Sequence, residues 1–296
     1  NTKTTIITSK DEDKGTLTVS NYDGKGAEHT FTGRDTVCIT RGGALEDEAG
    51  LSLISSFQNS QAFMVNTRAA MLTCDNKLTT ALLFEKFGLS TPKTAFITNE
   101  NNIKSGVDMI GGKFPLILKT LTGTQGVGVI KIDSYEALVA TVQAMWKLEA
   151  ELLIQEYMPS KFDVRTFVVD NKIFASTKRV HSSYDFRSNT HRGAEAEPYI
   201  LNDEEKELVL KAARLSRAYM VGVDHIIHNN KPYLLEINGS PGSGADYEGY
   251  QHKDYYSDSE PSGRIDGEKM MSNVVDWLTN RAHWDRQSLV ECGWLE

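Results

Sequence analysis

The sequence predicts a mixed α+β fold of three lobes, and three observations support this. Short β-branched runs at residues 4–8 and 36–40 are typical of strands near the start of the chain. Residues 114–157 alternate between apolar strands, a glycine-rich loop and one amphipathic helix. Asp170 and Asn171, and later Asn229 and Asn230, separate pairs of apolar runs and so predict two β-hairpins. The last lobe is therefore expected to contain an antiparallel sheet.

The first two lobes are assigned to residues 1–74 and 75–158. In the first, a helix is expected at residues 51–57, after the two strands. A helix with Asp75 as its N-cap candidate opens the second lobe and runs to residue 87, where Gly88 and Pro92 end it. Ser134 is expected to cap the next helix. The buried face of this helix is expected to consist of Leu138, Val142, Met145 and Trp146. The strands of the lobe are expected at 114–119, 127–132 and 152–157.

The third lobe is assigned to residues 159–296. A long helix is expected to begin at Asn202 or Asp203, with Leu208 and Ala212 on its apolar face. Residues 239–263 are polar and rich in glycine and serine, so they are interpreted as a loop. A last helix should follow residue 266. The predicted strands are 164–169, 173–177, 221–227 and 233–237, and the stripe of the last helix is Met271, Val274, Val275 and Leu278.

The composition is that of a globular protein and restricts its partners. The chain has 296 residues, of which 40% are apolar and 24% are charged, enough for more than one core. A net charge of −8 argues against direct nucleic-acid binding over the whole surface. Three cysteines without a CxxC pair predict a reducing, cytoplasmic setting. No apolar run has the length of a membrane helix, so no membrane partner is expected.

A glycine-rich segment joins the first two strands of the middle lobe. Lys119 comes just before residues 122–128, whose glycines would let backbone N–H groups approach a polyphosphate while the lysine adds positive charge. No GK[ST] ending and no helix follow it, which excludes a Walker loop and a dinucleotide fingerprint. The segment is interpreted as a flap over a nucleotide, although a plain hairpin tip fits the segment equally well when taken alone.

Three oxygen-bearing side chains are predicted to meet on two neighbouring strands. Glu236 and Asn238 are two apart on one strand and therefore share a face. If the turn pairs His228 with Pro232, Asp224 lies directly opposite Glu236. Two carboxylates this close repel each other unless a cation neutralises them, and oxygen ligands suit Mg²⁺. A metal site is preferred over ordinary surface acids because Glu236 is embedded in an apolar strand.

Basic groups concentrate between residues 178 and 192 of this acidic chain. Such a cluster is usually a solvated face, but this one continues into a polar loop that could hold a γ-phosphate, an acyl phosphate or an acidic substrate. An arginine, Arg41, also follows the second predicted strand, where an α/β sheet places a ligand-facing loop. The basic or titratable residues of the cluster are Lys178, Arg179, His181, Arg187, His191 and Arg192.

Together these segments resemble the ATP-grasp superfamily and, within it, the RimK-type ligases. The matching stretches occur in family order over most of the chain. They are MIGGKFPLILKTLTGTQGVGV, LLIQEYMPSKFDVRTFVV, DFRSNTHRGA, KAAR, GVD and LLEINGSPG. The chain departs from the pattern in its short first lobe, in NGSPG for the more usual NASPG, in the polar loop at 243–263, and in a tail that carries Trp284 and Trp294.

The resemblance implies roles for the matching positions. Nucleotide binding falls to Lys77, Lys119, Gly123, Gln125, Gly126, Gly128, Glu156, Tyr157, Asp163, Arg187, Ser188 and Asn189. The implied ligands for Mg²⁺, with Mn²⁺ as an alternative, are Asp224, Glu236 and Asn238. The implied catalytic residues are Lys119 and Arg187. The substrate side is assigned to Arg41, Arg179, His181 and Arg192.

The family's reaction forms an amide bond and releases ADP. A carboxylate attacks the γ-phosphate of ATP, and an amine then displaces phosphate from the acyl phosphate. RimK ligases add glutamate to the C-terminus of a small-subunit ribosomal protein. The resemblance therefore predicts ATP, glutamate and an acidic peptide or protein C-terminus as partners, and it is compatible with a homo-oligomer.

Three alternatives remain open from the sequence. The ligase could act on a different peptide or amino acid, because the departures from the family pattern fall in loops of the kind that select substrates. A related ATP-grasp enzyme could phosphorylate a small molecule instead of forming an amide. A binding module could retain the nucleotide without turnover, although the metal ligands that such a module would lose first are present.

Overall fold

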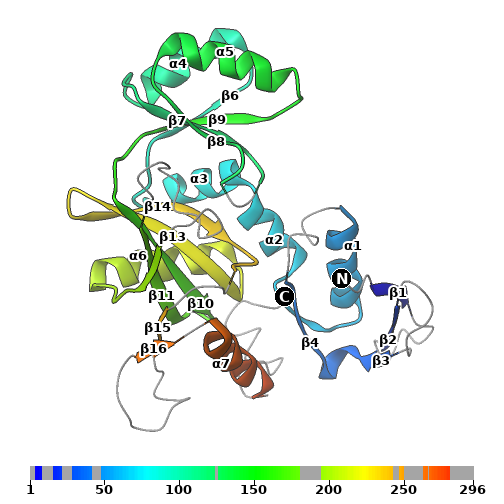
Figure 1. The fold of residues 1–296 in the computed structure, drawn as a ribbon. Helices are drawn as coiled ribbons and strands as arrows, with labels where there is room; N and C mark the ends of the chain where they lie inside the picture. The colour runs from blue at the N-terminus through cyan, green and yellow to red at the C-terminus, as the bar shows by residue number, and fades with distance from the viewer. Residues whose placement is uncertain are drawn as a thin grey trace.

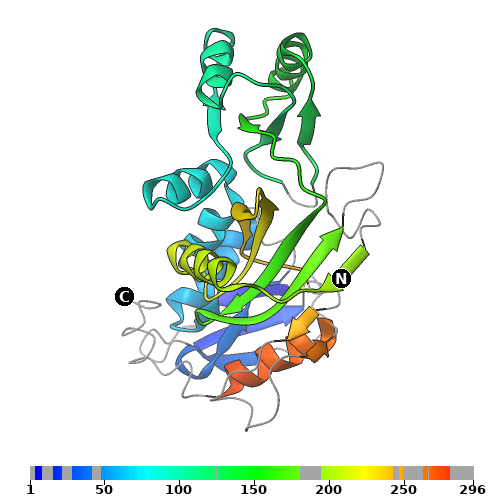
Figure 2. The same ribbon diagram turned by 90° about the vertical axis from the view of Figure 1, so that its left-hand side faces the viewer.

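The computed structural model has the mixed helix and antiparallel-sheet architecture predicted from the sequence (Figures 1 and 2). It describes residues 4–8, 16–21, 29–41, 48–123, 126–180, 195–242, 247–249, 263–265 and 267–280. Within these residues, no helix combines the length and the hydropathy that crossing a membrane requires.

The first part of the chain holds more strands than the sequence analysis predicted. The predicted strand at residues 4–8 is confirmed, but it belongs to a three-stranded antiparallel sheet. A separate parallel pair flanks the first helix, and its second strand was also missed. The elements are β1 (Thr4–Thr8), β2 (Thr16–Asn21), β3 (His29–Thr32), a 3₁₀ turn (Gly33–Asp35), β4 (Val37–Ile39), α1 (Glu48–Asn59) and β5 (Phe63–Val65).

A further helix, which was not predicted, precedes the one that was predicted to start at Asp75. Helix α2 (Arg68–Asp75) ends at that residue, and α3 (Lys77–Lys86) begins after Asn76. Asn76 has an extended backbone that breaks the helix, and its side chain accepts a hydrogen bond from the Thr79 amide at 3.0 Å. The predicted cap at Asp75 was therefore wrong by one residue, because the side chain that satisfies the free amide is the asparagine.

The central part is a four-stranded sheet in the order β6-β9-β7-β8, with two helices packed on it (Figure 1). The predicted Ser134 cap is confirmed, since its side chain accepts from the Ala137 amide at 3.2 Å. Leu138 and Val142 of the predicted stripe are fully buried. The elements are β6 (Thr94–Ile97), α4 (Glu100–Met109), β7 (Leu116–Thr120), β8 (Val129–Ile132), α5 (Tyr135–Trp146) and β9 (Leu152–Glu156).

The last part is a seven-stranded antiparallel sheet in the order β14-β13-β10-β11-β15-β16, with β12 also paired to β11. One face packs against α6 and the other against α7 and β5. The elements are β10 (Phe162–Val169), β11 (Lys172–Val180), β12 (Glu195–Pro198), α6 (Asp203–Ser216), β13 (Met220–His228), β14 (Lys231–Asn238), β15 (Tyr247–Gly249), β16 (Gly263–Ile265) and α7 (Gly267–Thr279).

Both predicted hairpin turns are present. Asp170 and Asn171 have φ of 51° and 55°, and Asn229 and Asn230 have φ of 51° and 61°. A two-residue type I′ turn requires positive φ at both of its central residues. The polar stretch predicted as a loop contains β15 in its described part.

The stripe of the last helix also differs from the prediction, because Met270 and Trp277 are buried whereas Val275 is 43% exposed.

Candidate active site

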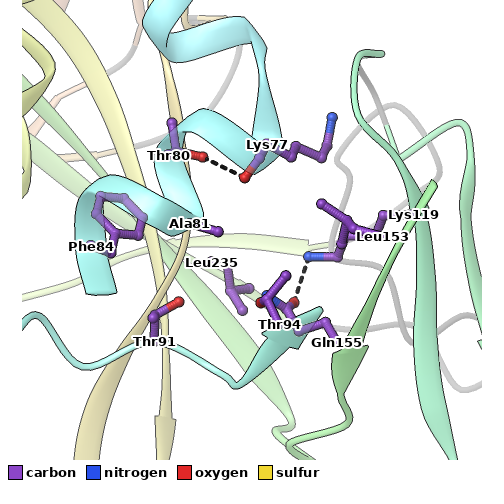
Figure 3. Close-up of a pocket in the computed structure, with 10 residues that line it drawn as sticks. All are labelled: Lys77, Thr80, Ala81, Phe84, Thr91, Thr94, Lys119, Leu153, Gln155 and Leu235. Atoms are coloured by element: carbon purple, nitrogen blue, oxygen red, sulfur yellow. Dashed lines mark hydrogen bonds between the residues drawn. The ribbon is translucent and has the colours of Figure 1, made fainter. Parts of the chain in front are cut away.

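A small pocket lies between helix α3, the central sheet and strand β14 (Figure 3). Two lysines enter it, Lys77 from the start of α3 and Lys119 from β7. Strand β14 contributes one lining residue, and the Leu234 amide beside it donates to Ser90 O at 2.8 Å instead of to another strand. The other lining residues are Thr80, Ala81, Phe84, Thr91, Thr94, Leu153, Gln155 and Leu235.

Lys119 is held in this pocket by a side chain that the sequence analysis missed. Its Nζ donates to Gln155 Oε1 at 2.7 Å, and Gln155 Nε2 donates in turn to Thr94 Oγ1 at 2.9 Å (Figure 3). Burial lowers the pKa of Lys119 to about 8, although the nearby Glu236 carboxylate opposes the shift. The one sequence signal for Gln155 was its place beside Glu156, which gave no reason to prefer it.

This lowered pKa predicts a pH dependence for anion binding. Phosphate charge beside Lys119 raises its pKa, so binding takes up a proton when the free lysine is neutral. Nucleotide affinity should therefore fall as pH rises above about 8, by up to about tenfold per pH unit. Titration calorimetry at that pH in two buffers of different ionisation enthalpy measures the uptake. Lys119→Met should remove it, and Lys113→Met, at an exposed site, should not.

The glycine-rich segment joins β7 to β8, as the flap interpretation required. Lys77 Nζ donates to Gly123 O at 2.8 Å, which ties the start of α3 to the segment. Gly128 has φ of 78°, and a Cβ there would overlap Thr120 Oγ1, so only glycine fits. Gly123 and Gly126 also have positive φ, whereas Gln125 lies outside the described residues.

The two residues predicted to contact the adenine lie at the end of β9, where Glu156 is the last residue of the strand and Tyr157 follows it. Glu156 Oε1 accepts from the Lys93 amide at 2.8 Å, so its side chain anchors the chain between the pocket and β6. Tyr157 packs under Lys131, whose Nζ lies 4.8 Å from the ring centroid. Their nucleotide roles stay predictions, although the geometry places both beside Gln155.

A ladder of buried charges lies on one face of the large sheet. Asp163 and Arg165 of β10, Arg179 of β11 and Asp224 of β13 alternate in sign across three adjacent strands. Arg165 donates two hydrogen bonds to Asp224, from Nε to Oδ1 at 2.7 Å and from Nη2 to Oδ2 at 2.6 Å. Arg179 holds Asp163 at 2.6 and 2.7 Å and also reaches Asp224 Oδ2 at 2.8 Å. The four charges form one hydrogen-bonded network.

The ladder changes the electrostatic argument for a metal. Burial alone would raise the pKa of Asp224, but Arg165 and Arg179 hold it well below its ordinary value. The same two aspartates raise the pKa of Arg179 against the opposing effect of burial. The cations that neutralise Asp224 are therefore arginines of the chain itself. The repulsion between the paired carboxylates does not by itself call for a metal.

Asp224 lies directly opposite Glu236, as predicted, but the strand register that brings them together differs from the predicted one. The turn pairs His228 with Lys231, one residue earlier than expected, and an irregularity next to Asp224 restores the register. Asn238 is two residues further on the same strand, and its Oδ1 accepts from the Ser240 amide at 2.9 Å. The structure thus brings the three predicted oxygen ligands to one end of the sheet.

The chemistry of these three side chains fits Mg²⁺. The Glu236 side chain is 40% exposed, and the nearest cation within the described residues, Arg165 Nη2, is 4.0 Å away. Asp224 Oδ1 accepts from Arg165 Nε, and a carboxylate oxygen has two lone pairs. Two carboxylates and an amide oxygen form a hard-oxygen set. No cluster of three or more histidine, cysteine or acidic side chains suited to a metal occurs in the described part of the chain.

Several predicted residues either contact other residues of the chain in the structure or lie outside the described residues. Arg179 is only 7% exposed and is engaged with two aspartates, which leaves its predicted substrate contact without structural support. Arg41 is exposed and donates from Nη1 to Pro241 O at 2.5 Å. Outside the described residues lie Gln125, His181, Arg187, Ser188, Asn189 and Arg192.

Known proteins are similar to this chain in sequence and in fold. A family model described as a RimK-like ATP-grasp domain matches residues 74–250. A probable alpha-L-glutamate ligase from Vibrio vulnificus (strain YJ016) is 34% identical over 206 residues, which cover 69% of this chain and 68% of the relative.

Two solved structures resemble this chain at lower sequence identity, so they bear on the fold alone. D-alanine–D-alanine ligase from Bacillus anthracis complexed with ATP has a TM-score of 0.57 at 18% identity, over 70% of this chain and 69% of that one. The macrocyclase MdnC bound with precursor peptide MdnA from Microcystis aeruginosa MRC has a TM-score of 0.59 at 16% identity, over 81% and 80%. The family match covers more than half of the chain, and the chain therefore belongs to the RimK-like family of ATP-grasp ligases.

Proposed function

We propose that this chain is an ADP-forming ligase that joins the amine of glutamate to the carboxylate at a peptide or protein C-terminus. One observation carries the proposal: two lysines and the Glu236-bearing strand β14 face the same pocket from different parts of the fold. Such an arrangement can hold a polyphosphate between a cationic wall and an oxygen ligand set. The similarity to probable alpha-L-glutamate ligases supports glutamate as the amine.

The residues that line the pocket, and the predicted nucleotide-binding residues outside its lining, have distinct proposed tasks. Lys77 and Lys119 neutralise charge on the phosphates, and Gln155 keeps the Lys119 ammonium aimed at them. Glu156 and Tyr157 contact the adenine. Asp163 faces the ribose, in an orientation that Arg179 fixes.

The proposed metal ligands are Asp224, Glu236 and Asn238, with Mg²⁺ preferred and Mn²⁺ as an alternative. When bound, the ion supplies charge neutralisation for the phosphate oxygens. The chain contributes the geometry: Arg165 and Arg179 hold Asp224 in one orientation, while Glu236 stays exposed at the end of the sheet. Arg187 stabilises the oxyanion in this proposal, and the flap excludes water from the acyl phosphate.

The acceptor is the finer part of the proposal. We place the protein in the cytoplasm, acting on an acidic peptide C-terminus such as that of a small-subunit ribosomal protein, and as a homo-oligomer. Arg41, His181 and Arg192 are proposed to meet this substrate, whereas Arg179 is better explained as support for Asp224. A small-molecule kinase is the second candidate function, and its phosphoester product distinguishes it from a ligase.

The test supplies ATP and Mg²⁺ with each common amino acid in turn and a peptide that ends in glutamate. The expected result is phosphate release with glutamate, together with successive mass increments of one glutamyl residue on the peptide. A phosphorylated amino acid or peptide would instead support the kinase. Absence of ADP formation with every amino acid, with this peptide and with the C-terminal tail of the ribosomal protein, would refute the proposed function.

A further inference from the structure

A buried amide from the N-terminal part of the chain joins the two strands that carry the proposed metal ligands. Asn66 follows β5 and has no exposed surface. Its Nδ2 donates to Met220 O at 2.6 Å and to Gly239 O at 2.7 Å, and its Oδ1 accepts from the Met220 amide at 2.9 Å. Met220 begins the strand that carries Asp224, and Gly239 directly follows Asn238.

The loop at residues 239–242 receives a second contact from the same part of the chain. Arg41 donates to Pro241 O, so the carbonyls of two loop residues are bound by side chains that precede the central sheet. The loop in turn controls Asn238, because the Ser240 amide donates to Asn238 Oδ1 at 2.9 Å. A displacement of the loop would rotate or release the amide oxygen proposed as a metal ligand.

Helix α2 packs closely against the loop at Gly239. A Cβ at this position would lie 2.9 Å from Met71 Sδ and 3.3 Å from Cys74 Cβ. Both neighbours are buried in α2, so an alanine cannot fit unless the methionine moves. At Gly242, in the same loop, a Cβ would meet nothing within 4 Å. Gly239 and Gly242 therefore differ in the space that an added methyl group would meet.

We propose that helix α2 positions Asn238 through the loop that Asn66 also anchors, and that Gly239 is glycine because Met71 of α2 occupies the space of an alanine side chain. The inference rests on the proposed function, since it concerns a ligand of the same site. A positioning role and a purely structural role predict different results. If α2 positions Asn238, displacement of the loop should weaken metal-dependent nucleotide binding, while the fold and the nucleotide affinity without metal stay unchanged.

The test measures binding of a non-hydrolysable ATP analogue by titration calorimetry, once with Mn²⁺ and once with EDTA. Gly239→Ala is expected to weaken binding about tenfold or more with Mn²⁺, the size of effect seen when the support of a metal ligand is lost, and to leave binding in EDTA unchanged. Gly242→Ala is the matched control and should bind like wild type.

The decisive variant adds Met71→Ala to Gly239→Ala, because the truncated side chain removes the atom that the new Cβ would meet. Affinity with Mn²⁺ should return to within about threefold of Met71→Ala alone, the non-additivity expected for residues in contact. Met71→Val, which also lacks the δ atom but leaves a smaller void, replaces Met71→Ala if thermal unfolding shows that the latter is unstable.

Three results would overturn the inference: a Gly239→Ala protein that binds like wild type with Mn²⁺, an equal loss with and without metal, or a double variant that stays impaired. A different set of results would show that the proposed function is wrong. A wild-type protein that binds the analogue more tightly with Mn²⁺ but ligates no peptide would refute the ligase assignment and leave the positioning result standing.

Discussion

Glu236→Gln is expected to lower ADP formation by about 10²–10³-fold, the scale seen when one stabilising group is removed from a phosphoryl- or acyl-transfer site. Gln matches Glu in size but lacks the negative charge that strengthens the binding of a hard cation. Glu236 is 40% exposed and 4.0 Å from the nearest cation in the described part of the chain, Arg165 Nη2, so the fold should tolerate the change. Steady-state ADP formation and thermal unfolding together check both expectations.

A second readout links this carboxylate to the pocket lysine. Because Glu236 opposes the lowering of the Lys119 pKa, its neutralisation should let that pKa fall further below 8. Proton uptake on nucleotide binding should then begin at lower pH than in wild type. Glu207→Gln, at an exposed site on α6, makes the same change in net charge and should alter neither readout. Full turnover in Glu236→Gln would show that the metal assignment is wrong.

The sequence predicted the elements around the site better than the contacts within it. Apolar periodicity and turn residues located both hairpins, the Ser134 cap and the strands that carry Lys119 and Glu236. The opposition of Asp224 and Glu236 was predicted correctly from a turn that was wrong by one residue, because an irregularity in the ladder compensated. Such irregularities depend on packing between strands and leave no local sequence signal.

Long-range side-chain contacts could not be predicted from spacing. Gln155 and Asn66 act on partners far away in the chain, and neither carries a charge or a motif that would have drawn attention to it. Arg179 was read as part of a surface cluster because its neighbours in sequence are basic. Its strand position turns it inward, where two aspartates neutralise it. Strand alternation separates it from Lys178, but only once the sheet face is known.

Arg179→Met is expected to destabilise the fold strongly. The change leaves Asp163 buried without its guanidinium and leaves Asp224 with Arg165 alone. Breaking a buried ion pair costs about 3–5 kcal/mol, mainly because a buried charge is left uncompensated. For a chain of this size that corresponds to a fall in the unfolding midpoint of the order of 10 °C. Thermal and urea unfolding at neutral pH would measure it.

Lys178→Met provides the matched control, since Lys178 directly precedes Arg179 in the same strand and pairs with Glu197 at a more exposed site. An exposed pair contributes about 0–1 kcal/mol, so this variant should unfold close to wild type. Arg179 and Lys178 are adjacent in β11 and lie on opposite faces of the sheet. The difference in unfolding stability between their two variants therefore reports the loss of the buried ion pairs and not the general effect of removing a cation from β11.

The pH dependence of the loss identifies its electrostatic origin. Because the arginines lower the pKa of Asp224 in the folded state, their stabilisation is complete above its ordinary value of 3.8 and is lost as pH falls below that. The free-energy difference between wild type and Arg179→Met should therefore narrow between neutral pH and about pH 3. A variant with wild-type stability but a raised KM for the peptide would instead make Arg179 a substrate contact. A constant difference at every pH would point to lost packing alone.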